Sequence, residues 1–244
     1  MPGGAGSVAP GVIAGVIASV YAGVVAAAGI APLVQGGSIP PVWHVVTLPQ
    51  QAVPVTRYGA ETVDGREALR IQTQGSYGNL VHELPAIQAP QRLRWAWRLQ
   101  QPNTAVDLRL KAGDDAAVKV CMSFDMALER VPFVERQMLK LARSRSGQDL
   151  PAATLCWVWG ATEAKGALMP NAYSRRVRYI VLRNREDALA TWFEESRDVS
   201  ADFRRAFGDE SIELPALTAL IVSGDGDNTG GASLAHVSGL RVEP

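Results

Sequence analysis

Most of the chain consists of short apolar runs separated by turn residues. The clearest run is 91–99 (QRLRWAWRL), in which apolar and polar positions alternate. A period of two is typical of a β-strand with one buried face, so we expect Trp95 and Trp97 to be buried and Arg94 to be exposed. Other short runs predict strands over 43–46, 68–73, 80–84, 116–124, 154–159, 175–183, 189–196, 216–222 and 235–242.

Two segments show a helical period instead. Over 133–145, apolar residues recur every three or four positions, with arginine and lysine between them. Over 198–207, Phe203 and Phe207 lie four residues apart on one face, and Ser200 is a candidate N-terminal cap. Many strands and only two helices predict a mainly β fold, an antiparallel jelly-roll-like β-sandwich with one or two peripheral helices.

The beginning of the chain has a different composition. No charged side chain precedes Arg57, and 8–34 is almost entirely apolar. Such a segment fits a membrane-spanning helix or the apolar region of a signal peptide, although the basic residues that usually open a signal are missing. We therefore expect two parts: an apolar export signal or membrane anchor with its linker over 1–38, and the β-sandwich domain over 39–244. Export would place the domain in the periplasm or cell envelope, and an uncleaved segment would hold it at a membrane.

Charge and cysteine content restrict the partners. Lys plus Arg and Asp plus Glu each number 24, so the net charge is zero and no strongly basic face for nucleic acid is indicated. Cys121 and Cys156 both lie in strand-like runs. An exported protein could join them in a disulfide, but we favour the alternative that both are buried thiols. Two cysteines and three histidines form no recognisable zinc pattern.

The loop over 225–230 (DGDNTG) carries the strongest chemical signal. Asp225 and Asp227 lie two residues apart beside Asn228, which resembles the opening of a calcium-binding EF-hand loop. The twelfth position, where that loop needs a glutamate, is His236. We favour a turn ordered by side-chain bonds to its own backbone, mainly through Asp225 and Asp227. Calcium at these two aspartates and a ligand-binding loop remain alternatives, and no other cofactor is expected.

Further candidate ligand-binding residues are aromatic or polar. Trp159 borders a glycine, so it is the tryptophan expected to be exposed enough to stack on a sugar ring. Asp115, Asn171 and Arg175 are candidates for a polar pocket, in which an arginine fork would grip an anionic group. The alternative is that these charges are solvated strand ends paired with one another.

Six segments together resemble one bacterial family, the domain of unknown function numbered 3047. They are 92–99, 112–125, 153–160, 170–182, 195–208 and 223–235. The resemblance implies an exported β-sandwich protein, and it brings no established activity, substrate or cofactor.

These observations favour a non-catalytic binding domain of the cell envelope, with carbohydrate as the favoured ligand and no catalytic residue. One alternative is a hydrolase acting on envelope polysaccharide, with carboxylates such as Asp115, Asp125, Asp225 and Asp227 as candidates. Another is a structural or assembly protein without a small ligand. The sequence contains no Gly-x-Ser-x-Gly elbow, HExxH motif, phosphate-binding loop or dinucleotide fingerprint.

Overall fold

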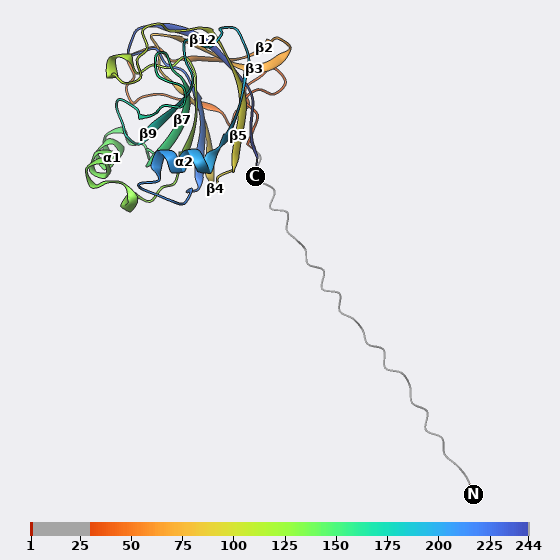
Figure 1. Cartoon of the computed structure of the whole chain (residues 1–244), viewed down its shortest axis with the longest axis vertical. Helices are drawn as coiled ribbons and strands as arrows, with labels where there is room; N and C mark the ends of the chain where they lie inside the picture. The colour runs from red at the N-terminus through yellow and green to blue at the C-terminus, as the bar shows by residue number, and fades with distance from the viewer. Residues whose placement is uncertain (2–29, 244) are drawn as a thin grey trace.

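Two β-sheets pack face to face in the computed structural model, which describes Met1 and residues 30–243 (Figure 1). One sheet has seven strands in the order β1 (His44–Val46), β4 (Asn79–Ile87), β11 (Leu217–Ser223), β6 (Lys119–Phe124), β7 (Ala153–Trp159), β9 (Val177–Arg183) and β8 (Leu168–Pro170). The other has five, in the order β10 (Phe193–Asp198), β5 (Arg92–Gln101), β12 (Ala232–Glu243), β3 (Arg66–Gln74) and β2 (Arg57–Val63). The predicted mainly β, jelly-roll-like sandwich with two helices is confirmed.

The sheets differ from the prediction in two respects. β2 and β8 were not predicted, because neither has a clear apolar run. The sandwich is also not wholly antiparallel, since β7 and β9 pair in parallel. The long connection over 160–176 carries the chain back to the starting end of β7, which permits the parallel pairing.

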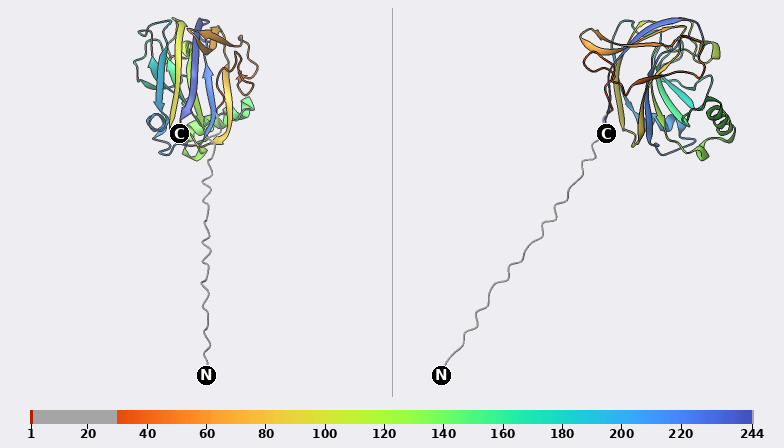
Figure 2. Two further views of the ribbon diagram at one scale, coloured as in Figure 1. Left: turned by 90° about the vertical axis from the view of Figure 1, so that its right-hand side faces the viewer. Right: turned by 180° about the vertical axis from the view of Figure 1, so that it is seen from behind.

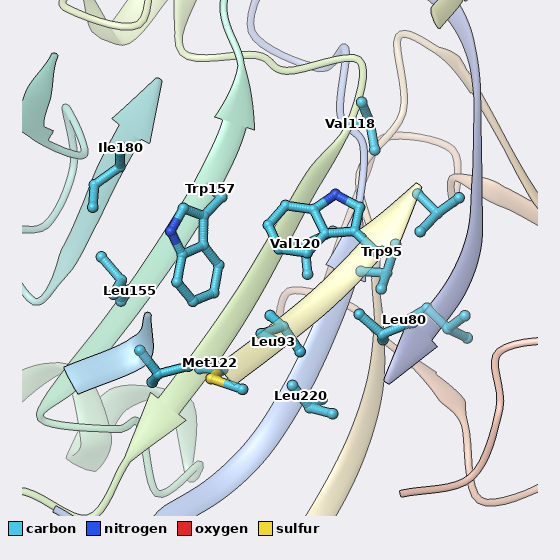
Figure 3. Packing of buried hydrophobic residues seen from close by; sticks show 14 of the residues in the cluster. Leu80, Leu93, Trp95, Val118, Val120, Met122, Leu155, Trp157, Ile180 and Leu220 are labelled. Atoms are coloured by element: carbon cyan, nitrogen blue, oxygen red, sulfur yellow. The ribbon is translucent and has the colours of Figure 1, made fainter. Parts of the chain in front are cut away.

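Four tryptophans from facing strands fill the middle of the sandwich. Trp95 and Trp97 of β5 are fully buried, as predicted, whereas the side chain of Arg94 keeps 40% of its surface exposed. Their rings lie 5.6 and 5.7 Å from those of Trp157 and Trp159 of β7. Figure 3 shows Trp95 and Trp157 pointing into the same apolar layer. Large aromatic rings supply much of the buried apolar area in such a core.

The two helices lie at one end of the sandwich (Figures 1 and 2). α1 (Phe133–Ser146) joins β6 to β7 and ends at Gly147, whose positive φ of 66° suits a glycine. α2 (Val199–Phe207) buries Phe203 and Phe207, as its spacing predicts. Its cap is Asp198, which accepts a hydrogen bond from the Ala201 amide at 2.8 Å, so the prediction of Ser200 as the cap was wrong.

The folded part begins before the predicted boundary at residue 39. Leu33 is 3% exposed within the main core, and the Ala31 carbonyl accepts a hydrogen bond from the Trp43 indole at 3.2 Å. Most of the predicted export or anchor segment, over 2–29, lies outside the described residues. Among the residues that the structure describes, no helix is long and apolar enough to span a membrane.

Candidate functional site

The outer face of the seven-stranded sheet carries the candidate site. Because successive side chains of a strand point to opposite faces, Val120 and Met122 of β6 enter the core, whereas Lys119, Cys121 and Ser123 point outward. Strand register aligns the outward residues in three rows: Asn79, Ser223, Lys119 and Val158; Val81, Ile221, Cys121, Cys156 and Tyr179; and Glu83, Ala219, Ser123 and Thr154.

The middle row contains a disulfide. Cys121 and Cys156 are register partners on the neighbouring strands β6 and β7, and their sulfur atoms are bonded. The favoured interpretation of two free buried thiols was therefore wrong. The sequence placed each cysteine on a strand, but it could not show that the two strands are adjacent with these residues opposite each other. A disulfide is consistent with a protein that folds outside the cytoplasm.

Loops cover only half of this outer face. A second apolar cluster buries Val158, Tyr179 and Val181 of β7 and β9 beneath Val106 and Leu108 from the loop after β5. Among the described residues, no loop covers the half formed by β1, β4, β11 and β6 in this way, and this half forms the floor of a cavity of about 620 Å³. We call this cavity the hollow.

The hollow combines an aliphatic floor with a polar rim. Val81, Ala219 and Ile221 form part of the floor. The rim includes Glu83 and Asp125, and its opposite wall is the loop between α1 and β7, over 148–152. Ligand pockets typically combine apolar walls with a few polar groups that orient the ligand.

A β-bulge shapes the floor of the hollow. The pairing of β11 with both of its neighbours shifts between Leu217 and Ala219. The hydroxyl of the bulged residue, Thr218, donates a hydrogen bond to the Ser123 carbonyl at 3.1 Å. Bulges bend a strand and redirect side chains, and they are frequent beside binding sites.

A buried polar cluster lies on the same sheet, at the end marked by the first row. Lys119 and Asp225 form an ion pair at 2.5 Å, with side chains 10% and 6% exposed. The other carboxylate oxygen of Asp225 accepts a hydrogen bond from the Ala116 amide at 2.6 Å. Asp225 thus connects its loop to β6 rather than to its own turn.

Asp115 holds the 225–230 loop in place. Its fully buried carboxylate accepts hydrogen bonds from the backbone amides of Asn228 and Thr229, at 3.2 and 2.8 Å, and from both of their side chains. Asp227, by contrast, has one buried oxygen without a partner among the described residues, and burial raises its pKa. The expectation that Asp225 and Asp227 order the loop through their own backbone was wrong, because Asp115 comes from another loop.

Asp114 is an acid of the cluster whose pKa is altered by burial. It is 5% exposed and accepts a hydrogen bond from the Asn171 amide, which also donates to the Tyr179 hydroxyl at 2.7 Å. Burial is the largest cause that raises the pKa of Asp114 to about 6, and the nearby ammonium of Lys119 opposes it. This carboxyl group therefore exchanges its proton much closer to neutrality than an ordinary aspartate does.

The structure gathers some of the predicted site residues and separates others. Asp115, Asn171, Asp225, Asp227 and Asn228 contribute to the polar cluster. Arg175 does not: its guanidinium pairs with Glu135 of α1 at 2.9 Å, and its side chain is 67% exposed. Trp159 is 2% exposed and donates to the Asn184 carbonyl, so the expectation that it is an exposed stacking platform was wrong. Its strand position faces Trp97 across the core.

The calcium alternative does not fit the residues present. The ammonium of Lys119 already lies against Asp225, where a cation would have to bind. Within Met1 and residues 30–243, no three His, Cys, Asp or Glu side chains are arranged to hold a metal ion. Lys119 is the partner that sequence reasoning missed. A lysine inside the buried run 116–124 is a signal for a paired acid, but it does not identify which acid.

Fold and site together define a jelly-roll-like β-sandwich protein with a half-open outer sheet face. The chain belongs to the family described as protein of unknown function (DUF3047), which matches residues 41–241. No curated protein matches the sequence. Solved structures with a similar fold include endoglucanase 3 of family GH12 from Trichoderma harzianum and endoglucanase cel12A from Rhodothermus marinus.

The first of these structures is 8% identical, with a TM-score of 0.42, and the match covers 82% of this chain and 98% of that one. The second is 13% identical, with a TM-score of 0.40, and covers 82% and 95%. At these identities the likeness concerns the fold alone.

Proposed function

We propose that this protein is a non-catalytic binding domain of the cell envelope, and that the hollow holds a carbohydrate. The observation that carries the proposal is the hollow itself, a cavity of about 620 Å³ with an aliphatic floor and a polar rim. Its size lies within the roughly 300–1,000 Å³ typical of small-ligand sites. Trp159 is buried and does not line the hollow.

The chemistry of the hollow suits a sugar ring. A pyranose has apolar C–H faces and a rim of hydroxyl groups. Ile221 and Val81 offer aliphatic contact to such a face, and the exposed carboxylate of Glu83 can accept hydrogen bonds from hydroxyl groups. Hydrogen bonds to charged acceptors are stronger than those between neutral groups, so the Glu83 carboxylate would fix the orientation of the sugar.

The charges of the rim favour neutral or amine-bearing sugars. The guanidinium of Arg143 is already used, because it donates to the Leu150 carbonyl at 2.8 Å and pairs with Asp149 at 3.0 Å. Three carboxylates that line the hollow are exposed, those of Glu83, Asp125 and Asp149, and Asp149 is the one paired with Arg143. Like charges brought together repel, so uronic or sulfated sugars are expected to bind less well.

A cell-envelope location is supported by the disulfide and by the apolar segment over 8–34. Both are typical of exported proteins. An envelope protein meets polysaccharide at high local concentration, which is compatible with a shallow site of moderate affinity.

The test is a glycan array that compares neutral glucans, chitosan oligosaccharides and oligouronates, followed by calorimetry with the best binder. We expect binding without release of reducing ends. Glu83→Gln with Asp125→Asn should weaken it about tenfold or more, because two charge-assisted hydrogen bonds are lost. Glu186→Gln, at an exposed position outside the hollow, is the matched control. Absence of binding, or binding that the double variant leaves unchanged, contradicts the proposal, and release of reducing ends would favour the hydrolase alternative.

A further inference from the structure

The outward face of α1 is apolar and has no partner among the described residues. Four large apolar side chains of this helix keep at least half of their surface exposed: Phe133 (67%), Val134 (67%), Met138 (64%) and Leu141 (50%). Val134, Met138 and Leu141 recur every three or four residues and so form one face, which Phe133 extends. A helix that covers a core would turn these residues inward, so this face is available for another contact.

Polar contacts hold the opposite side of α1 against the domain. Glu135 pairs with Arg175 at 2.9 Å and with the buried Arg176, which also pairs with Glu210. Leu139 is the buried apolar residue of the helix. The orientation of α1 is therefore fixed by this network, and the apolar face is not free to rotate inward.

The charged residues of α1 that border its apolar face are all positive. Lys140 and Arg145 are exposed, and the guanidinium of Arg136 lies 5.7 Å from the ring centre of Phe133. The one acidic residue of α1, Glu135, points inward to its arginines. Asp149, just after the helix, is paired with Arg143 at 3.0 Å.

We propose that α1 docks on an anionic phospholipid surface. An exposed apolar face bordered by lysine and arginine is the pattern of helices that lie in the membrane interface, with apolar side chains among the acyl chains and cations at the headgroups. Each basic residue near such a surface adds attraction to anionic lipid. A second copy of this chain is the less suitable occupant, because pairing two α1 faces would bring Lys140 and Arg145 of both copies together. This inference does not depend on the carbohydrate proposal.

Co-sedimentation of the full chain with vesicles tests the proposal. One set of vesicles contains phosphatidylcholine alone, and the other adds phosphatidylglycerol. We expect the full chain to bind the anionic vesicles more tightly, and Met138→Ser with Leu141→Ser to weaken that binding about a hundredfold, since each buried apolar side chain contributes about tenfold. Lys140→Gln with Arg145→Gln should remove most of the preference for the anionic vesicles. The apolar segment over 8–34 is common to all variants, so the differences report on α1.

Matched control variants distinguish binding through α1 from non-specific binding to vesicles through other exposed residues. Leu110→Ser with Ile212→Ser removes apolar residues that are 59% and 78% exposed elsewhere. Arg57→Gln with Arg185→Gln removes two exposed cations outside α1. Both controls should bind as the unaltered chain does. Equal binding of the Met138/Leu141 variant to anionic vesicles would overturn the proposal. So would a concentration-dependent dimer, seen by analytical ultracentrifugation, that the same variant abolishes, because it would assign the face to a second copy.

Discussion

At the scale of single residues, the aspartates of the polar cluster have different roles although their side chains are identical. Asp225 neutralises the buried Lys119, and Asp115 accepts hydrogen bonds from the 225–230 loop. Asp114 has a pKa raised to about 6 by burial. The sequence located the acidic loop but not these roles, because the partners are far apart along the chain: Lys119 is 106 residues from Asp225, and Asn171 is 57 residues from Asp114. Only the fold brings them together.

Replacement of Asp115 is expected to be more costly than replacement of Asp227. Asp115→Ala removes a fully buried carboxylate and leaves the half-buried amides of Asn228 and Thr229 without this acceptor, so we expect a loss of about 3–5 kcal/mol in the free energy of unfolding. Asp227→Ala removes a carboxylate whose pKa is raised by burial, and should cost less than about 1 kcal/mol. Urea unfolding measures both. Asp209→Ala, whose side chain is 72% exposed, is the control, and a larger loss for Asp227→Ala would contradict this account.

Asp114 should make the protein less stable as the pH rises from about 4 to about 6. Its pKa is raised from 3.8 to about 6, so over this range the folded state binds the proton more tightly than the unfolded state. The stabilisation from this proton is complete below the unfolded pKa and is lost as the pH passes the folded pKa; it amounts to about 3 kcal/mol at most.

The Asp114→Asn variant isolates this contribution. Subtracting its pH–stability curve from that of the unaltered protein should give a difference that falls between pH ~4 and ~6 and is flat above. Asn can still accept the hydrogen bond from Asn171. A difference that is flat throughout, with Asp209→Asn as the exposed reference, would show that the pKa of Asp114 is not raised.

At the scale of elements, the spacing of apolar residues predicted the strands and helices that depend mainly on their own sequence. The alternation around Trp95 and Trp97 placed β5 correctly, and the spacing of Phe203 and Phe207 placed α2. The cap is Asp198 rather than the predicted Ser200. Both residue types are good caps, and the exact first turn depends on packing against β10. The disulfide could not be predicted, because it requires β6 and β7 to be neighbours in register.

Loss of the disulfide should destabilise the domain substantially. The bond closes a loop between residues 35 positions apart, for which the chain-entropy model gives about 4 kcal/mol. We expect Cys121→Ala with Cys156→Ala to lower the urea midpoint accordingly. Dithiothreitol should shift the unaltered protein toward the same midpoint and leave the double variant unchanged. If dithiothreitol lowered the urea midpoint of both proteins equally, its effect would not come from reduction of the Cys121–Cys156 bond.

At the scale of the whole molecule, the sequence predicted the sandwich but not the hollow. Within residues 30–243, the hollow forms because the loop after β5 covers β7 and β9 but not β4 and β11, while the loop after α1 forms the opposite wall. Which strands share a face depends on the strand order, and no local pattern encodes that order. The domain boundary was misplaced for a similar reason, since the apolar character of Leu33 fits an export segment as well as a core.

The start of the folded part can be tested with two shortened chains. A chain beginning at Ile30 should unfold at the same denaturant concentration as the full chain. A chain beginning at Ile39 loses Leu33, which is 3% exposed, and the bond from the Gly37 amide to Glu67, so it should be less stable by about 2–4 kcal/mol. Equal stability of the two shortened chains would place the boundary at residue 39 after all.

The four core tryptophans also give the protein an internal optical reporter. Trp95 and Trp97 lie edge to face with ring centres 5.3 Å apart, and each is close to a tryptophan of the opposite sheet. Indoles held this closely couple their electronic transitions, so the far-ultraviolet circular dichroism should contain an aromatic couplet besides the β-sheet signal. The part of its amplitude that comes from the Trp95–Trp157 and Trp97–Trp159 pairs depends on the distance between the two sheets. Separation of the sheets could thus be followed in time without any attached label.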